Sequence, residues 1–513
     1  MQFSENKKIA FTLFSTLTNF AISILISLFI TPYIVNQLGS EAHGFIGLAN
    51  SFTSYASLAT VALNSMAGRF ISIEIYKNNY RAASKYYSSV FFSNLLLALL
   101  FVPAFVFVVF RLEHLSEIPA ALVTDVKITF AITFLQYILS LLLSRYETAT
   151  FVTNKLYLSQ RNSTISSVLR LLIVVLCFGL FSTKVSYLAL GYLVASLFVH
   201  LMNMYYSRKF IPDLKTQVSL VRFSAIQELT LSGIWNLLNK LSSILLDGLD
   251  LLITNVFIGS AEMGALSISK TIPALFMTLR GSLDYPFTPS ITRCYAKGDI
   301  DGVVKYARFG NKLLGIFMIA PMAVFAVFGQ SFFKLWVPLE NSSLIQILSL
   351  LSIMSLISGA CINSVFTIFS ITNKLRANSI VIMVSGIITI TTNFFLLKYT
   401  SLGVYCIAGV SSICSLLRNY IFTPLYGAHC LGVKKSTFYH EILTGNACLF
   451  LNVAIAYLIG RITVPDSWIK LILLVGISAI VCIAVNSVIV LSRSDKQAVF
   501  SYVKRFLNSK LRV

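Results

Sequence analysis

Eight ionisable side chains lie inside stretches of the chain that are otherwise apolar. A charge at the centre of a membrane helix costs roughly 2.5–3.5 kcal/mol, so these side chains must face other protein groups or an aqueous cavity. They are Arg170, Lys240, Asp247, Asp250, Lys270, Arg280, Asp284 and Arg418. Basic residues outnumber acidic ones in this set, which favours an anionic substrate.

Arg170 is the strongest single candidate for binding a phosphate group. It lies nine residues beyond Arg161, about 13 Å at the helical rise, and therefore near the middle of a membrane. Its own segment holds no acidic residue at helical spacing, whereas Lys240 and Asp247 share a helix face. The alternative reading of Arg170 is a structural contact to another helix, and that of the Lys240–Asp247 pair is mutual neutralisation.

A diphosphate group inside a membrane needs cations around it, because its charge cannot cross hydrocarbon unaided. The other candidates for such contacts are Lys240, Lys270, Arg280, Arg418 and Arg69. Arg280 has the alternative of pairing with Asp284 four residues later. Arg69 has the alternative of serving only as an orientation signal in a cytoplasmic loop.

The carboxylates suggest a separate hypothesis, ion coupling. Asp247 and Asp250 could carry a proton or coordinate Na⁺, and Asn393, with Thr389 and Thr392 nearby, could supply neutral oxygens. Coupling to a proton or Na⁺ gradient is therefore an expectation. The alternative is that Asp247 only neutralises Lys240.

The elements that must position these residues are membrane helices. The chain of 513 residues is 57% hydrophobic and 12% charged, far from a soluble profile. Apolar runs of spanning length recur along it. We expect an all-α polytopic membrane protein with fourteen spans, at residues 10–34, 44–68, 86–110, 122–143, 162–182, 186–206, 229–258, 263–288, 310–333, 344–371, 378–398, 402–427, 441–461 and 468–492.

The net charge of +21 is distributed as an orientation signal and not as a nucleic-acid surface. Basic residues concentrate in every second loop, within residues 69–85, 145–161, 208–222, 293–312, 374–376 and 434–435, and in the C-terminal tail. We therefore expect both termini to be cytoplasmic, contacts with membrane lipids and no nucleic-acid partner. An even number of helices agrees with this topology.

The motifs of other function classes are absent from the sequence. The eight cysteines form no close metal-ligand pair, and there is no Walker-type loop or zinc motif. We expect no catalytic residues, no metal site and no bound cofactor. A membrane glycosyltransferase or ligase would need carboxylates on large outer loops, and the predicted outer loops are short.

An internal repeat organises the chain. Leu38-Gly39-Ser40-Glu41-Ala42-His43-Gly44 returns 220 residues later as Ile258-Gly259-Ser260-Ala261-Glu262-Met263-Gly264, and Lys85-Tyr86 returns as Lys305-Tyr306. Ser40 is expected to cap the helix that follows the turn. Such repeats are typical of transporters built from two related lobes. The copies differ in charge, since Ile30 corresponds to Asp250 and Asn50 to Lys270, which places ion handling mainly in the second lobe.

These residues carry a family resemblance. Pro32-Tyr33, the 38–44 motif, Leu63-Asn64-Ser65 and Arg69-Phe70 resemble the N-terminal signature of Wzx-type polysaccharide flippases, which transport O-antigen or capsule repeat units. These flippases belong to the multidrug/oligosaccharidyl-lipid/polysaccharide exporter (MOP) superfamily. Pro273, Pro286 and Lys297-Gly298-Asp299 resemble the start of that family's second lobe. His43 departs from the family pattern, in which many relatives have an aromatic residue.

The resemblance implies an architecture and an activity. The expected lobes are residues 1–222 and 223–436, with two further helices and a basic tail in 437–513. The family moves undecaprenyl-diphosphate-linked oligosaccharides to the outer leaflet of the bacterial inner membrane by alternating access, without breaking a covalent bond. It also implies polysaccharide polymerase machinery as a partner.

Two other activities remain open on the same scaffold. A lipid II-type flippase also carries a polyprenyl diphosphate. A cation-coupled multidrug exporter usually depends on acidic residues in the first lobe, and here none lies between Lys8 and Glu41.

Overall fold

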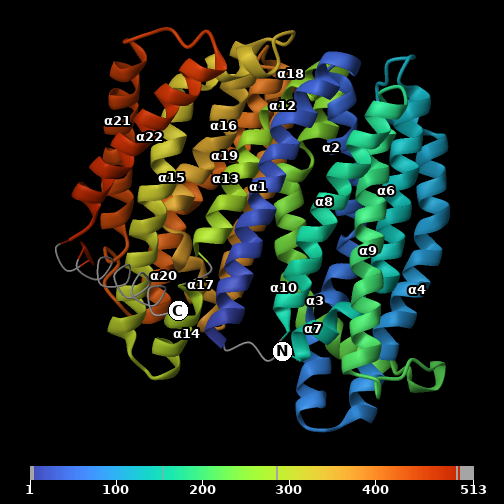
Figure 1. The fold of residues 1–513 in the computed structure, drawn as a ribbon. Coiled ribbons are helices and arrows are strands. Elements are labelled where there is room, and N and C mark those ends of the chain that lie inside the picture. The colour runs from blue at the N-terminus through green and yellow to red at the C-terminus, as the bar shows by residue number, and fades with distance from the viewer. Residues whose placement is uncertain (1–4, 154, 285–286, 493–494, 497–513) are drawn as a thin grey trace. The chain divides into compact units, whose positions relative to one another are not determined.

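Every regular element that the structure describes is a helix (Figure 1). The structure is a computed structural model that describes residues 5–153, 155–284, 287–492 and 495–496. The all-α prediction is confirmed, and the apolar helices are those of a multi-pass membrane protein. The basic tail beyond residue 496 lies outside the described residues, as does residue 493.

The first half of the chain forms helices up to the turn before Ser260. They are α1 (Glu5–Leu38), α2 (Ser40–Ala56), α3 (Leu58–Tyr76), α4 (Tyr80–Phe110), α5 (Leu112–Leu115), α6 (Val123–Leu143), η1 (Ser144–Glu147), α7 (Thr148–Val152), α8 (Leu156–Leu180), α9 (Ser186–Phe210), η2 (Val218–Leu220), α10 (Phe223–Ser243), η3 (Ile244–Gly248) and α11 (Asp250–Phe257).

The second half continues in the same way. Its elements are α12 (Ser260–Ser269), α13 (Thr271–Asp284), α14 (Thr288–Ala296), α15 (Ile300–Trp336), α16 (Ser342–Ala360), α17 (Asn363–Ile371), α18 (Leu375–Tyr399), α19 (Val404–Leu417), η4 (Arg418–Phe422), α20 (Thr423–Leu431), α21 (Tyr439–Gly460) and α22 (Trp468–Val490). Both η3 and η4 are π turns.

Each of the fourteen predicted spans coincides with one helix or with consecutive helices. Among the described residues, ten helices are long and apolar enough to cross a membrane, and α1 adds a shorter apolar stretch at Ile24–Leu38. The predicted spans 44–68, 229–258, 263–288, 344–371 and 402–427 each cover more than one helical element. The sequence pattern therefore located the spans but not their interruptions.

The interruption between α12 and α13 has an identifiable cause. Pro273 lacks the N–H that would bond the carbonyl of Ser269, and α12 ends at that residue. The Ser349 hydroxyl donates to this carbonyl at 2.8 Å. A buried carbonyl at membrane depth needs such a partner. In η3, the Tyr55 hydroxyl donates to the Gly248 carbonyl at 2.7 Å in the same way.

The backbone conformations of the two repeat copies match at positions 220 residues apart. Gly39 and Gly259 both adopt positive φ, at 86° and 150°, values that glycine tolerates best. Asn78 and Gly298 also both have positive φ. Asn79 then caps α4, and Asp299, its counterpart, caps α15.

The expectation that Ser40 caps α2 is wrong. The helix begins at Ser40, and its N-cap is Gly39, with no side-chain hydrogen bond. The positive φ required at the turn explains the difference, because glycine supplies it without a cap. In the second copy, the Ser260 hydroxyl donates to Glu41 at 3.3 Å.

The chain divides into two compact units by packing. Unit 1 holds residues 1–268 and 382–407, and unit 2 holds residues 269–381 and 408–513. In unit 1, α4, α6, α9 and α8 pack in succession (Figure 1), and α3 packs on α10. In unit 2, α15 packs against α16, α21 and α22. The lobe boundaries expected at 222 and 436 stay a prediction.

Candidate functional site

The nine predicted site residues divide between the two units. Unit 1 holds Arg69, Arg170, Lys240, Asp247, Asp250 and Asn393, and unit 2 holds Lys270, Arg280 and Arg418. Within each unit, the structure brings some of them close to one another or to polar partners that the sequence did not reveal.

In unit 1, helix α2 presents a polar face to α10 and η3. Lys240 Nζ donates to Ser54 Oγ at 2.8 Å. The next residue, Tyr55, donates to the carbonyl of Gly248. These contacts hold α2 against α10 and against η3, which carries Asp247.

The same helix makes close glycine contacts with the second copy. A Cβ built on Gly44 would lie 3.2 Å from Gly264 Cα, and one built on Gly264 would lie 2.5 Å from the carbonyl carbon of Ser40. His43 Nδ1 lies 3.0 Å from Ser267 Oγ. The two duplicated turns therefore pack directly on each other, which requires glycine on both sides.

The carboxylates differ in environment. Asp247 lies in the π turn η3 and is exposed. Asp250 begins α11 and is only 3% exposed. Asn393 on α18 is also buried, and its Oδ1 has no hydrogen-bond partner among the described residues. A π turn widens a helix locally and is frequent at functional sites.

Helix α18 runs along the segment that carries these aspartates. A Cβ built on Gly386 would lie 2.7 Å from the Cβ of Leu245 in η3. Further along, the rings of Phe394 and Phe257 meet edge to face with centroids 6.3 Å apart. Asp250 lies between these two contacts along the chain. Asn393, which directly precedes Phe394, lies in the corresponding interval of α18.

Arg170 and Arg69 occupy different surroundings in unit 1. The Arg170 guanidinium lies 4.4 Å from the centre of the Tyr192 ring on α9, a distance typical of a cation–π contact. Its Nε is buried without a hydrogen-bond partner in the described part of the chain. Arg69 on α3 is exposed. Arg170 therefore makes a contact with another helix, which is the structural alternative given above. Its buried Nε remains a donor without a hydrogen-bond partner among the described residues.

In unit 2, two predicted arginines approach one polar group of residues. A Cβ built on Gly359 would lie 3.0 Å from Arg280 Nη1 and 3.8 Å from Asn419 Nδ2. Arg418 Nη2 donates to Asn419 Oδ1 at 3.4 Å, and Asn419 Nδ2 donates to Ser358 Oγ at 3.1 Å. The Arg280 guanidinium on α13 therefore lies beside Gly359 of α16, and the Arg418 guanidinium at η4 is linked to Ser358 of the same helix through Asn419.

Lys270 lies at the break between α12 and α13 and is half-buried. The Asp284 side chain lies outside the described side chains, so the Arg280–Asp284 pairing stays a prediction. No group of three or more His, Cys, Asp or Glu side chains suited to a metal ion is present among the described residues.

Sequence reasoning missed the partners of these charges. Ser54, Tyr55 and Asn419 contact residues far along the chain and carry no local signal. Glu441, which pairs with Arg308 in unit 2, did carry one, because it is the only acidic residue between Glu340 and Asp466. An isolated acid in such an apolar stretch indicates a buried ion pair.

Comparison with known proteins gives one relative over nearly the whole chain. The chain is 28% identical over 497 residues to the uncharacterized membrane protein EpsK of Bacillus subtilis (strain 168), and the alignment covers 97% of both proteins. No family model matches the sequence.

The fold is similar to the folds of solved membrane transporters. The chain is similar to the lipid II flippase MurJ in an inward closed conformation, with a TM-score of 0.66, 13% identity and coverage of 94% of this chain and 99% of that one. It is also similar to an inward-facing multidrug resistance transporter of the MATE family, with a TM-score of 0.59, 14% identity and coverage of 82% and 94%. These similarities show the fold.

Proposed function

We propose that this chain is a flippase that moves a polyprenyl-diphosphate-linked oligosaccharide from the inner to the outer leaflet of a bacterial cell membrane by alternating access. It acts as a carrier and breaks no covalent bond. Both termini lie in the cytoplasm, in accord with the basic loops. Polysaccharide polymerase machinery would receive the delivered unit.

The observation that carries this proposal is the pair of arginines in unit 2. Within apolar helices, Arg280 lies beside Gly359, and Arg418 donates to Asn419, which itself donates to Ser358. Two guanidinium groups with neutral amide and hydroxyl donors suit the oxygens of a diphosphate. Gly359 leaves room for this, because any side chain there would meet the Arg280 guanidinium.

A lipid II-type flippase is the second candidate, because the fold is that of MurJ. It would use the same arginines, since both substrates carry a diphosphate on a polyprenyl chain. The multidrug-exporter alternative fits the fold equally well, but the two arginines disfavour a cationic substrate.

Deletion of the gene followed by mass spectrometry of lipid extracts tests the proposal. We expect the deleted strain to accumulate a lipid-linked oligosaccharide on the cytoplasmic side and to lose one surface glycan, and a plasmid copy to reverse both effects. Accumulation of lipid II alone would support the second candidate. A strain without any trapped intermediate, tested with other flippases also removed, would contradict both.

We further propose that Asp250 and Asn393, with Asp247, couple transport to an ion gradient. Asp250 is 3% exposed, and a carboxylate in such a position can hold a proton or a cation in addition to its contacts with protein groups. The buried Asn393 Oδ1, which lacks a hydrogen-bond partner in the described chain, would supply a neutral oxygen to Na⁺.

Replacing Asp250 with asparagine is expected to abolish the gradient dependence of transport. Asparagine keeps the size of the side chain but holds neither a proton nor a formal charge. Transport by Asp250→Asn in vesicles should no longer respond to an imposed pH or Na⁺ gradient. Asp466→Asn, in an exposed position beyond α21, serves as the control. An unchanged gradient response in Asp250→Asn would remove the coupling proposal and leave the substrate proposal intact.

A further inference from the structure

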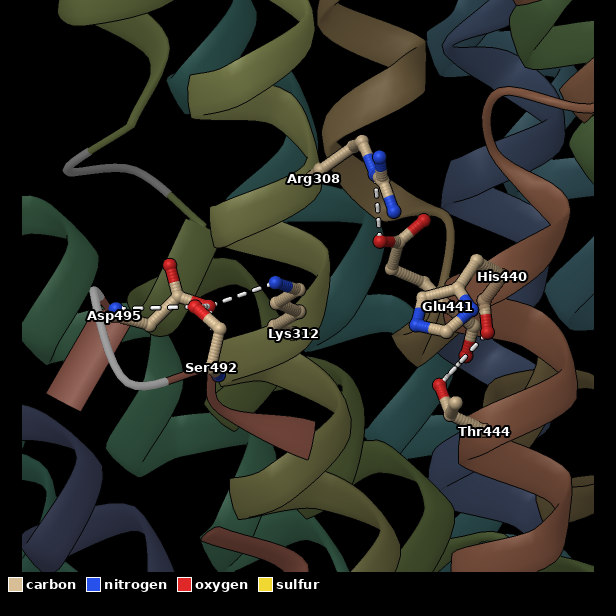
Figure 2. Close-up of polar contacts among 7 residues, drawn as sticks. All are labelled: Arg308, Lys312, His440, Glu441, Thr444, Ser492 and Asp495. Atoms are coloured by element: carbon tan, nitrogen blue, oxygen red, sulfur yellow. Dashed lines mark hydrogen bonds and ion pairs between the residues drawn. The ribbon is translucent and has the colours of Figure 1, made fainter. Parts of the chain in front are cut away.

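Two ion pairs join α15 to the C-terminal part of unit 2 (Figure 2). Arg308 Nε donates to Glu441 Oε1 on α21 at 2.8 Å. One turn further, Lys312 Nζ donates to Asp495 Oδ2 beyond α22 at 2.7 Å. Burial raises the pKa of Asp495, but the hydrogen bonds from Lys312 and Ser492 outweigh it and hold that pKa below its ordinary value.

A small, partly open cavity lies beside these pairs, among α15, α21 and α22. Its volume is about 10 Å³, close to the smallest volume that accommodates one water molecule. Its walls are formed by Asn311, Lys312, Gly315, Ile319, Glu441, Thr444, Gly445, Cys448, Asn486 and Val490.

Three almost fully buried residues of the cavity wall each have one polar atom without a hydrogen-bond partner. They are Asn311 Nδ2, Glu441 Oε2 and Asn486 Oδ1, on residues that are 1%, 3% and 0% exposed. The orientations of the Asn311 and Asn486 side-chain amides are fixed by the hydrogen bonds that their other polar atoms make. Asn311 Oδ1 accepts from the Ser364 N–H at 2.9 Å, and Asn486 Nδ2 donates to the Ile316 carbonyl at 3.4 Å.

We propose that this cavity binds one ordered water molecule, which joins α15, α21 and α22. A water molecule donates two hydrogen bonds and accepts others, so it can donate to Glu441 Oε2 and Asn486 Oδ1 while accepting from Asn311 Nδ2. All three groups are then satisfied at once, as buried polar groups in proteins usually are. The inference is independent of the proposed function.

The local charges favour a neutral ligand over a metal cation. Arg308 and Lys312 balance Glu441 and Asp495, so the surroundings carry no net negative charge that would attract a cation. The Asn311 amide also presents its N–H₂ group, which repels a cation. The water site would therefore join α21 and α22 to α15 through polar contacts that form only when all three helices are correctly aligned.

The direct test is an experimental map of the full-length protein in lipid nanodiscs, at a resolution where ordered waters are visible. We expect a single density peak within hydrogen-bond distance of Asn311 Nδ2, Glu441 Oε2 and Asn486 Oδ1. An empty cavity in a map that shows other buried waters would overturn the proposal.

A substitution at the cavity wall provides a second test, because a dry cavity and a hydrated cavity predict opposite changes in melting temperature. A Cβ at Gly315 would have Cys361 Sγ and Ile319 Cδ1 as its nearest neighbours, at 3.8 and 3.9 Å, so alanine fits without a clash. In a dry cavity, Gly315→Ala would raise the melting temperature, because alanine favours a helix and fills space. If water is bound, the methyl group competes with it and the melting temperature falls.

Gly476→Ala is the matched control. Gly476 lies inside α22 with no atom within 4 Å of its Cβ position, so its substitution measures helix propensity alone. We expect Gly315→Ala to melt below the parent protein and Gly476→Ala to melt at or above it. A rise in Gly315→Ala equal to that of the control would overturn the proposal.

Discussion

Arg280→Gln and Arg418→Gln are each expected to reduce transport of a diphosphate-linked lipid by about 10- to 100-fold, and the double variant is expected to have no measurable transport. A hydrogen bond to a charged group contributes about 1.5–3 kcal/mol, which corresponds to this range. Glutamine keeps a donor and much of the length but loses the charge. Transport should be measured in vesicles, with the substrate concentration varied to separate affinity from rate.

Arg461→Gln is the matched control for this prediction. Arg461 also lies in the C-terminal half of the chain, but it is exposed at the end of α21 and contacts Tyr457 of the same helix. The Arg461→Gln variant should transport the substrate at the same rate as the parent protein. Full activity in the Arg280→Gln/Arg418→Gln double variant, folded and inserted normally, would show that the arginines hold helices together and bind no substrate.

Gly233→Ala is expected to have the largest effect on stability. A Cβ built on Gly233 would lie 1.9 Å from the carbonyl oxygen of Ala62 and 2.7 Å from its carbonyl carbon. The obstacle is backbone, so no side-chain rotation relieves it, and α3 and α10 must separate. Overpacking typically costs about 1–3 kcal/mol, and a backbone clash of this kind should reach or exceed the upper end.

The control is Gly68→Ala on α3, where nothing lies within 4 Å of the Cβ position. The melting temperature in detergent should fall sharply for Gly233→Ala and stay level or rise for Gly68→Ala. Because α10 also carries Lys240 and leads into η3, Gly233→Ala should impair transport as well. Equal melting temperatures for the two variants would mean that α3 and α10 do not cross as described.

The sequence predicted the framework of the fold because the signals are local. Apolar runs located the helical segments, and among the described residues ten helices are long and apolar enough to cross a membrane. The repeat predicted turns that recur in φ angle at Gly39 and Gly259. The break at Pro273 could have been anticipated, since proline cannot donate to the fourth preceding carbonyl. The π turns at Asp247 and Arg418 could not, because nothing in their local sequence distinguishes them from a regular helix.

The sequence identified candidate charged residues but not their partners, and the site stays a prediction. Burial cost identified Arg280, Arg418 and Asp250 one residue at a time. Their surroundings depend on contacts between distant segments, such as Asn419 with Ser358 and Lys240 with Ser54. A single sequence holds no record of such contacts.

Flipping by the purified protein in liposomes tests the central claim most directly. The substrate is the undecaprenyl-diphosphate-linked oligosaccharide isolated from the deleted strain, and the signal is its appearance in the opposite leaflet, read by a membrane-impermeant glycan-modifying enzyme. We predict translocation well above protein-free liposomes, and none by the Arg280→Gln/Arg418→Gln variant. Translocation no faster than in protein-free liposomes, with the protein folded and an ion gradient imposed, would contradict the account.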